Sequence, residues 1–515
     1  MKGDPLLGEH LMRTAAKTAA LMAVLTLGTK VLGFLREVFM AGFFGTSYIV
    51  DAYVMASAIP GILFAGIFTS VAVSYMPIFS RIVEEKGIDE GNRFTAESIT
   101  LASFIALITA LAGIIFAGPV VEILARGFTG KTAELTVFFL RITFSYVIFT
   151  AATGLLESYL QYKGTFLKPV LAGYLQSGFV LAAIIISAYY SYYLLAFGLL
   201  IGSILRLVAV FFVAKGKGFR YRPTMRIGKA AKEIMVLAVP VFIGSTVNQI
   251  NSFVDKMLAS GLAEGSVSAL NYGYLLINMI TALTITIIVT IIYPRLTQSI
   301  AASDHSRFNE SIGTGMNIIL IISLPCSLGA MLYSSPVVQL VYERGAFNGA
   351  STELTAGAFF YYAAGLTFIA VNALLVKVYY SMEDMRTPVI CGIFGAAVNI
   401  SLNLLLVGPM AHRGLALATS IAAVINALLL YYLLRRKYPK TRIITDWAKV
   451  LKIAIATVLS VSFSWLVFAG LQDFSAVHSL VSLVSAVAAA GAVYLIALKL
   501  FRIKELSMLR EMLRF

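Results

Sequence analysis

Charged residues interrupt the apolar sequence near the start of the chain. Residues 29–77 read as two hydrophobic helices long enough to cross a bilayer, yet they carry Lys30, Arg36, Glu37 and Asp51. A charge at membrane depth costs roughly 2.5 to 3.5 kcal/mol on insertion scales unless it faces a bundle interior or a hydrated cavity. These four side chains are therefore the first candidates for a binding function. Arginine suits anionic groups such as phosphates, because it makes charge-assisted hydrogen bonds to them.

The spacing around Arg36 favours one arrangement of these charges. Gly33 lies one helical turn before Arg36, and we expect it to leave space beside the guanidinium. Lys30 and Glu37 share a helix face at a separation of seven residues, so we expect them to pair and to leave Arg36 as the free cation. The alternative is that all the charges pair within the bundle and fix the registry of its helices.

Two further sets of polar residues lie in later apolar segments. Arg141, Glu157, Arg206 and Lys377 are candidates for lining a hydrated cavity, although the last three lie close enough to segment ends for their side chains to extend to the membrane surface. The second set consists of amide, hydroxyl and carboxylate side chains: Asn248, Gln249, Asn251, Asp255, Asn399, Asn403 and Thr419. Hydrogen bonding between helices is the alternative role for this set.

The composition indicates that apolar, membrane-embedded segments carry these residues. Of the 515 residues, 59% are hydrophobic and 13% are charged, which is too apolar for an ordinary soluble domain. The net charge of +15 does not indicate nucleic-acid binding, because most Lys and Arg residues lie in short connections between apolar segments. Cys326 and Cys391 lie within apolar segments without metal-ligand spacing. No cleavable signal peptide is expected at the N-terminus.

Apolar segments of membrane-spanning length, about fourteen in number, follow one another along the whole chain. They cover residues 18–44, 49–80, 97–118, 133–162, 168–190, 192–214, 233–260, 267–298, 311–333, 353–382, 387–408, 413–436, 449–470 and 476–501. The expected fold class is an all-α polytopic membrane protein with about 14 transmembrane helices. An outer-membrane barrel does not fit, because its strands would alternate polar and apolar residues over short segments.

The connections between these segments predict the orientation of the chain. Basic residues gather after the even-numbered segments, for example in residues 215–229 and 435–442. Because positively charged connections stay on the cytoplasmic side, we expect both termini in the cytoplasm.

An internal repeat relates the two halves of the chain. GPVVEILARGF at residues 118–128 resembles SPVVQLVYERGAF at residues 335–347, and SYMP at residues 74–77 resembles IIYP at residues 291–294. Each half holds six apolar segments, so we expect two parallel six-helix lobes around a central cavity, with alternating access by rocking of the lobes. The expected domains are the N-terminal lobe (1–216), a basic cytoplasmic inter-lobe loop (217–232), the C-terminal lobe (233–437), and two additional transmembrane helices with a cytoplasmic tail (438–515).

Motifs for enzymatic chemistry are missing from the sequence. The four histidines form no HExxH motif, and neither a GxxxxGK[ST] phosphate-binding loop nor a GxSxG nucleophile motif occurs. An integral-membrane glycosyl- or acyltransferase would need a carboxylate pair or a His-Asp motif at a membrane face. We therefore expect a transporter and not an enzyme.

These features together resemble a known family. The block KVLGFLREVFMAGFFGTSYIVDAYVMASAIP at residues 30–60, the PxxS motif at residues 77–80 and the layout of two lobes plus two helices are similar to the MurJ (MviN) proteins. That family belongs to the multidrug/oligosaccharidyl-lipid/polysaccharide exporter superfamily. The resemblance implies a flippase that translocates lipid II, the undecaprenyl-linked peptidoglycan precursor, across the bacterial cytoplasmic membrane for cell-wall synthesis. The implied partners are this lipid-linked glycan, membrane lipids and proteins of peptidoglycan synthesis.

The resemblance also implies roles for single residues. Arg36 stands where the family has a cavity arginine, Asp51 matches its acidic residue in the second helix, and Lys30 stands where many members have another arginine. Arginines expected near Phe64 and Leu275 are replaced. Some members hold a sodium ion between three helices, which would make Na⁺ a coupling ion here. The positions that match this sodium site best are Asp255, Asn399, Asn403 and Thr419.

Two other transport functions stay open at this point. The replaced arginines favour a Wzx-type flippase for another polyprenyl-linked oligosaccharide. A drug or cation antiporter of the same superfamily would have an acidic and aromatic cavity, whereas Lys30 and Arg36 indicate a basic one.

Overall fold

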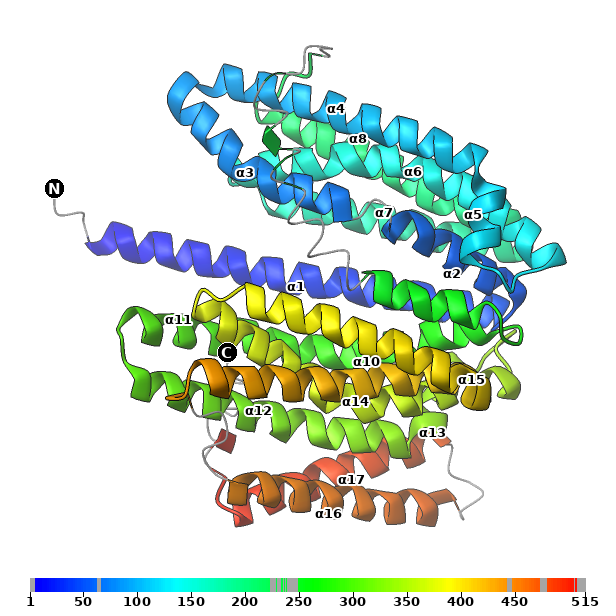
Figure 1. Cartoon of the computed structure of the whole chain (residues 1–515), viewed down its shortest axis with the longest axis vertical. Helices are drawn as coiled ribbons and strands as arrows, with labels where there is room; N and C mark the ends of the chain where they lie inside the picture. The colour runs from blue at the N-terminus through cyan, green and yellow to red at the C-terminus, as the bar shows by residue number, and fades with distance from the viewer. Residues whose placement is uncertain are drawn as a thin grey trace. The chain divides into compact units, whose positions relative to one another are not determined.

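The structure is a computed structural model, and every regular element among its described residues is helical (Figure 1). The described residues are 5–62, 66–222, 249–441, 447–472 and 479–503, with single positions at 228, 233, 234, 236, 238, 505 and 506. Helices are the expected solution in a membrane, because each one satisfies its backbone hydrogen bonds internally. The expected all-α membrane fold is confirmed.

The number of spans stays a prediction. Among the described residues, nine helices are long and apolar enough to cross a membrane. Residues 235, 237 and 239–248 of the expected seventh span (233–260) and most of the basic loop (217–232) lie outside the described residues.

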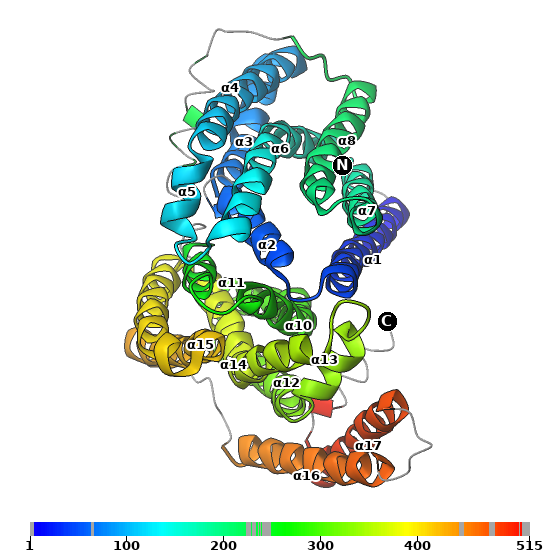
Figure 2. The same ribbon diagram turned by 90° about the vertical axis from the view of Figure 1, so that its right-hand side faces the viewer.

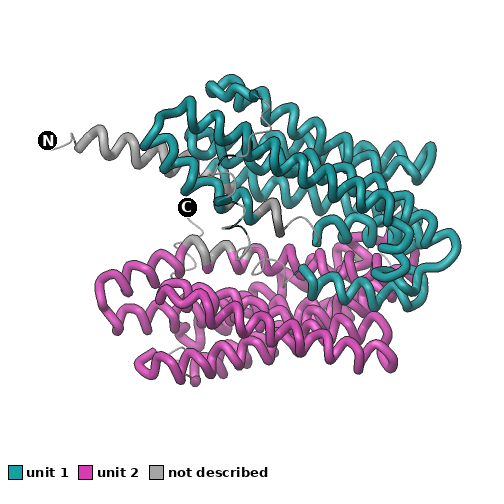
Figure 3. The backbone as a smooth tube through the Cα atoms, turned by 45° about the horizontal axis from the view of Figure 1, so that its top comes forward, with its two compact units in different colours: residues 1–265, 344–346 teal, residues 266–343, 347–515 magenta. Residues whose placement is uncertain are grey.

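The helices group into two compact units, coloured separately in Figure 3. Unit 1 comprises residues 1–265 together with Arg344–Ala346, and unit 2 comprises residues 266–343 and 347–515. The expected lobe boundaries stay predictions, because the helical segment that follows the inter-lobe loop is described only in part.

Unit 1 is a bundle in which one helix is central (Figure 2). Its elements are α1 (Pro5–Phe44), α2 (Tyr48–Pro60), α3 (Gly66–Lys86), α4 (Ile88–Ile115), α5 (Ala117–Leu124), α6 (Gly130–Tyr162), α7 (Leu167–Tyr189), the 3₁₀ helix η2 (Tyr192–Leu194), α8 (Leu195–Gly216) and the helical residues 249–259. Helix α6 packs against α2, α3, α4 and α8, while α7 packs against α1 and α8. The expected segment 49–80 contains α2, which ends at Pro60, and α3, which begins at Gly66; residues 63–65 between them lie outside the described residues.

Unit 2 is also built around one long helix. Its elements are α10 (Ser266–Ile287), the π-helical turn η3 (Ile288–Ile292), α11 (Tyr293–Ala301), α12 (His305–Leu332), α13 (Ser334–Tyr342), α14 (Gly349–Ser381), α15 (Arg386–Lys437), α16 (Trp447–Gln472) and α17 (Ser479–Leu500). Helix α14 packs against α10, α12 and α15, whereas α16 pairs with α17 and packs against α12. Ala411 has a non-helical backbone inside α15 (φ 51°, ψ −136°), so α15 consists of the two expected segments 387–408 and 413–436.

The lengths of the helices confirm the internal repeat. Helices α4 and α12 each have 28 residues, and α6 and α14 each have 33. A short helix precedes the longer member in each half, α5 before α6 and α13 before α14. The turn that follows also repeats its left-handed residue, Gly164 with φ 68° after α6 and Glu383 with φ 60° after α14.

One carboxylate holds the turn between α14 and α15. Asp384 Oδ1 accepts a hydrogen bond from the Thr387 amide (3.1 Å), and Oδ2 accepts from the Thr387 hydroxyl (2.7 Å) and from the Lys437 ammonium (2.7 Å). Since Lys437 is the last residue of α15, Asp384 ties the two ends of this folded-back helix pair together. Burial by itself raises the pKa of Asp384, but the hydrogen bonds from Lys437 and Thr387 outweigh burial and hold the pKa below its ordinary value.

The stability of the protein should therefore decrease in acid because of Asp384. A carboxylate whose pKa is lowered by folding stabilises the folded state above its ordinary pKa of 3.8 and loses this contribution as the pH falls through the lowered value. We expect the Tm of the purified protein to fall between about pH 5 and about pH 3. The Asp384→Asn variant should have a lower Tm at neutral pH and a flatter pH profile. Asp89→Asn, at an exposed position of α4, should keep the parent profile; identical profiles for the parent and Asp384→Asn would contradict this account.

Candidate functional site

An ion pair on α1 joins two of the residues expected in the site. The Arg36 guanidinium donates to Glu37 Oε1 through Nη2 (2.8 Å) and Nε (3.2 Å), and the two side chains are 30% and 12% exposed. The expected pairing of Lys30 with Glu37 is wrong, because the long Arg36 side chain reaches its direct neighbour on the helix. Lys30 is exposed, and it takes part in none of the ion pairs formed by described residues.

Two residues from other helices interact electrostatically with this pair. The Glu37 carboxylate interacts with the ammonium of Lys256, which follows Asp255 in the helical residues 249–259. Arg36 interacts with Tyr53, a buried residue of α2. Glu37 is thus a carboxylate that interacts with two cations, Arg36 and Lys256. Sequence reasoning missed Lys256, although a lysine in an apolar segment is itself a signal of function.

Gly33 is not needed to keep space free beside Arg36. A Cβ atom added at Gly33 would meet no described atom within 4 Å. The expected steric reason for the glycine is therefore wrong, because a larger residue fits at this position. A role for Gly33 in binding stays a prediction.

Asp51 is buried in α2, and its carboxylate accepts a hydrogen bond from a backbone amide. Its Oδ2 accepts a hydrogen bond from the Gly265 amide (2.7 Å), and Glu264 Oε1 accepts one from the Tyr48 amide (2.9 Å). Tyr48 is the first residue of α2, and the amides at the start of a helix have no helical carbonyl to bond to. Gly265 has φ 88°, a conformation that glycine adopts without strain. The two carboxylates therefore clamp the start of α2 to residues 264–265.

Two of the residues expected to line a cavity pair with each other. Arg206 of α8 donates to Glu157 Oε1 of α6 through Nη2 (2.8 Å) and Nε (3.0 Å), and to the side-chain oxygen of Gln176 on α7 through Nη1 (2.9 Å). The guanidinium thus joins three helices of unit 1. This geometry favours the alternative in which the charges hold the bundle together, and a cavity-lining role stays a prediction.

The other two candidates for cavity lining differ in their surroundings. Arg141 is exposed on α6. Lys377 of α14 places its Nζ 5.2 Å from the ring centroid of Tyr293 and 5.3 Å from that of Tyr380. Such cation–π contacts partly replace the water that the ammonium loses in the membrane.

The residues that match the sodium site lie in both units. In unit 2, Asn399 Nδ2 donates to Thr419 Oγ1 (3.2 Å) and Asn403 Nδ2 donates to Asn399 Oδ1 (2.9 Å). In unit 1, Asp255 is buried, while Asn248 lies outside the described residues. Among the described residues, no group of three or more His, Cys, Asp or Glu side chains could hold a metal ion. The hydrogen bonds in unit 2 fit the expected role of amides between helices, and the sodium site stays a prediction.

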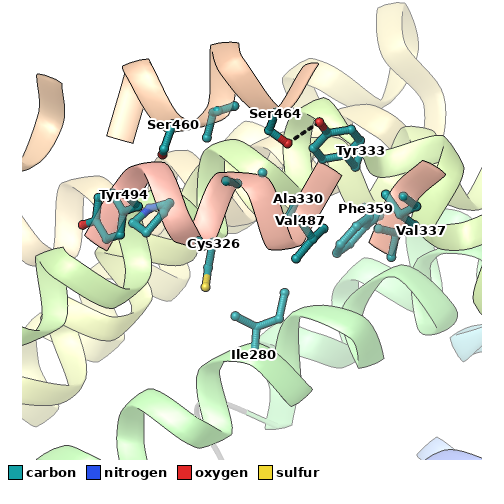
Figure 4. A pocket seen from close by; sticks show the side chains of 16 residues that line it. Ile280, Cys326, Ala330, Tyr333, Val337, Phe359, Ser460, Ser464, Val487 and Tyr494 are labelled. Atoms are coloured by element: carbon teal, nitrogen blue, oxygen red, sulfur yellow. Dashed lines mark hydrogen bonds between the residues drawn. The ribbon is translucent and has the colours of Figure 1, made fainter. Parts of the chain in front are cut away.

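Unit 2 contains an apolar pocket of about 480 Å³ (Figure 4). Helices α10, α12, α13, α14, α16 and α17 line it, with Ile280, Cys326, Val487 and Phe359 among the lining residues. Tyr333, which lies between α12 and α13, shares a hydrogen bond with Ser464 of α16. A pocket of this composition suits a hydrocarbon chain and offers few polar groups for a soluble ligand.

Comparison with known proteins gives one consistent result. The family model described as "Lipid II flippase MurJ" matches residues 40–488. A protein named "Probable lipid II flippase MurJ" from Rhizobium meliloti (strain 1021) is 29% identical over 469 residues, which is 86% of each chain. Another protein of that name, from Rickettsia prowazekii (strain Madrid E), is 30% identical over 439 residues, 81% of this chain and 83% of the relative.

Solved structures agree with the sequence relatives. A structure titled "Lipid II flippase MurJ, inward closed conformation" superposes with a TM-score of 0.81 at 25% identity and covers 94% of this chain and 98% of its own. An inward-facing multidrug resistance MATE family transporter of the MOP superfamily superposes with a TM-score of 0.63 at 15% identity, covering 79% of this chain and 94% of its own. The second match shows a shared fold.

The clamp at Asp51 predicts a stability effect in unit 1. We expect Asp51→Ala to destabilise the folded protein by about 1–3 kcal/mol, because the Gly265 amide loses a buried acceptor. Asp51→Asn keeps an acceptor oxygen and should cost less. Thermal unfolding of the purified variants measures both effects. Glu122→Ala, which removes an exposed carboxylate from α5, is the control; the clamp is ruled out if Asp51→Ala unfolds at the same temperature as Glu122→Ala.

Proposed function

The chain belongs to the lipid II flippase MurJ family, and on this premise we propose that it carries lipid II across the bacterial cytoplasmic membrane by alternating access. The single observation that carries this proposal is the family match over residues 40–488. The residues that we assign to head-group binding are Arg36, Glu37 and Lys256, together with Lys30 and Gly33 of α1 and Asp51 of α2.

The charges of unit 1 suggest how a pyrophosphate could be bound and released. An anion in a low-dielectric site needs cationic partners, and Arg36 already has its charge balanced by Glu37. When the pyrophosphate arrives, it replaces Glu37 as the partner of Arg36. Glu37 then keeps Lys256 as its counter-charge. Because Glu37 interacts with Lys256 as well as with Arg36, binding of the pyrophosphate to Arg36 does not leave the Glu37 carboxylate without a cationic neighbour.

The apolar pocket of unit 2 is the proposed site for part of the polyprenyl chain. Its lining is almost entirely hydrocarbon, and its volume of about 480 Å³ is large enough for a segment of an isoprenoid. A chain held there would stay in an apolar environment while the head group is moved.

Several finer assignments belong to the same proposal. Both termini are placed in the cytoplasm because the basic connections follow the even-numbered segments. A sodium ion at Asp255 or at the amide cluster of α15 would provide coupling to an ion gradient. The protein is proposed to be a transporter without catalytic activity, in keeping with its family.

Because two arginines expected from the family are replaced, we also consider a second class of substrate. Leu275 lies half-buried on α10, and Phe64 lies outside the described residues. If these losses alter the head-group contacts, the protein would carry another polyprenyl-linked oligosaccharide, as a Wzx-type flippase does.

Arg36 should be essential for transport. Arg36→Ala removes a charge-assisted contact worth about 1.5–3 kcal/mol, so we expect it to abolish rescue of bacteria depleted of their own lipid II flippase and to slow flipping in liposomes on the order of tenfold or more. Arg36→Lys should retain partial activity, because lysine keeps the charge and loses the planar fork. Arg295→Ala, at an exposed position of α11, controls for insertion. Normal rescue by well-expressed Arg36→Ala would contradict this role, and failure of the parent with lipid II would favour the second substrate class.

Filling the apolar pocket should affect only substrates with a long chain. A Cβ atom added at Gly491, which lines the pocket, would meet no described atom within 4 Å. The added side chain of Gly491→Leu therefore begins in open space at the pocket wall, and we expect it to reduce the volume of the pocket. We expect it to weaken binding of undecaprenyl lipid II several-fold and to leave a short-prenyl analogue unaffected. Gly470→Leu places the same side chain on the exposed side of α16 and should change neither; equal losses for the long and the short chain would contradict occupation of the pocket by the lipid.

A further inference from the structure

A polar pocket lies in unit 2 where α13, the start of α14 and the bend of α15 meet. Its volume is about 350 Å³, and its walls carry hydroxyl, carboxylate, guanidinium and aromatic groups. The groups that matter here are those of Ser334, Ser335, Glu353, Phe360, Tyr361 and Arg413. The pocket is separate from the apolar pocket, with which it shares none of these residues.

The backbone at the edge of this pocket is strained. Ala411 has φ 51° and ψ −136°, a conformation that costs of order 1–3 kcal/mol in a residue with a side chain. The neighbouring His412 is buried and its Nε2 lies 2.9 Å from the Leu354 carbonyl oxygen, which holds the bend against α14. Strain of this kind is retained where the surroundings enforce it, and it points to a functional site.

Because α15 bends at Ala411, the guanidinium of Arg413 lies at the pocket. Its Nη2 lies 3.4 Å from Glu353 Oε1, and its side chain passes over Gly357, where an added Cβ would lie 2.6 Å from Nε. Gly357 thus allows the arginine to lie flat on α14. The two charged side chains are 43% and 81% exposed, and such exposed pairs add little to stability. The ion pair therefore does not account for the strain at Ala411.

We propose that this pocket binds a pyranose sugar of a glycan. Arg413 donates to one ring hydroxyl and Glu353 accepts from its neighbour, so the pair recognises adjacent hydroxyl groups. The Ser334 and Ser335 hydroxyls supply further hydrogen bonds, and the rings of Phe360 and Tyr361, with centroids 5.2 Å apart, offer an apolar surface to the C–H face of the sugar. Because the cation and the carboxylate balance each other, the pocket suits an uncharged sugar better than a phosphate.

The proposal deepens the transport function and rests on it for the identity of the glycan. The head group of a lipid-linked peptidoglycan precursor contains sugars, so the pocket would bind the carried glycan at a second place. The pocket itself lies wholly in unit 2, and its chemistry does not depend on which lipid carries the sugar.

Saturation-transfer NMR on the full-length protein in nanodiscs tests the site with N,N′-diacetylchitobiose, an uncharged aminosugar disaccharide. Gly349→Trp should fill the pocket without removing a contact, because an added Cβ at Gly349 would meet no described atom within 4 Å. Arg413→Gln removes the charge and keeps a polar side chain. We expect millimolar binding to the parent and at least tenfold weaker binding to both variants. Gly118→Trp, at the repeat-related position of Ser335 and with equally open surroundings, should bind as the parent does.

Two results would overturn the proposal: no saturation transfer to the disaccharide with the parent, or parent-like binding by Gly349→Trp. Lipid II flipping by the same preparations separates this proposal from the transport function. Lipid II flipping without binding of the disaccharide would contradict the proposed sugar site and support the transport function. The remaining result is that the parent binds the sugar and both pocket variants lose this binding, while the protein does not flip lipid II. That result would support the sugar site and contradict lipid II as the substrate.

Discussion

Every charge placed among apolar helices needs a partner, and the arrangement of this protein depends on that requirement. Desolvating an ion costs several kcal/mol unless an opposite charge or a polar network replaces the lost water. Arg36 has Glu37, Arg206 has Glu157, and Lys377 has two tyrosine rings. The partners of Arg206 and the Tyr293 partner of Lys377 lie on other helices, so these two charges restrict how the neighbouring helices can be placed.

The ion pairs differ in how completely they are satisfied, and the proposed division into structural and functional charges rests on this difference. Arg206 bonds to Glu157 and also to Gln176, on two different helices. Arg36 bonds to its sequence neighbour on the same helix, while Glu37 also interacts electrostatically with Lys256. In our proposal, Glu37 can exchange Arg36 for Lys256 at a low cost in free energy. Arg206 cannot exchange its partners in this way, because its guanidinium joins three helices. This contrast is why binding is assigned to α1 and bundle stability to α8.

The two halves of the chain share a scaffold and differ in their polar groups. Helix lengths of 28 and 33 residues recur in both halves. The turn held by Asp384 has Gly164 in the corresponding turn of the first half, and Leu194 stands at the position that an offset of 219 residues relates to Arg413. A repeated fold therefore fixes where the helices lie, and substitutions on it give the two halves different polar groups at these related positions.

Hydropathy and spacing within the sequence determined the helical membrane fold, the repeat and the set of charged candidates, because each of these depends on local composition. Only the tertiary structure decided how those candidates pair. The periodicity of an ideal helix predicted Lys30 with Glu37, but the flexible side chain of Arg36 makes that contact instead. Asp51 and Gly265 meet across 214 residues of sequence, and Lys256 interacts electrostatically with Glu37 from another helix. Such contacts depend on which helices become neighbours and on the rotamers that packing allows, and no local pattern encodes either.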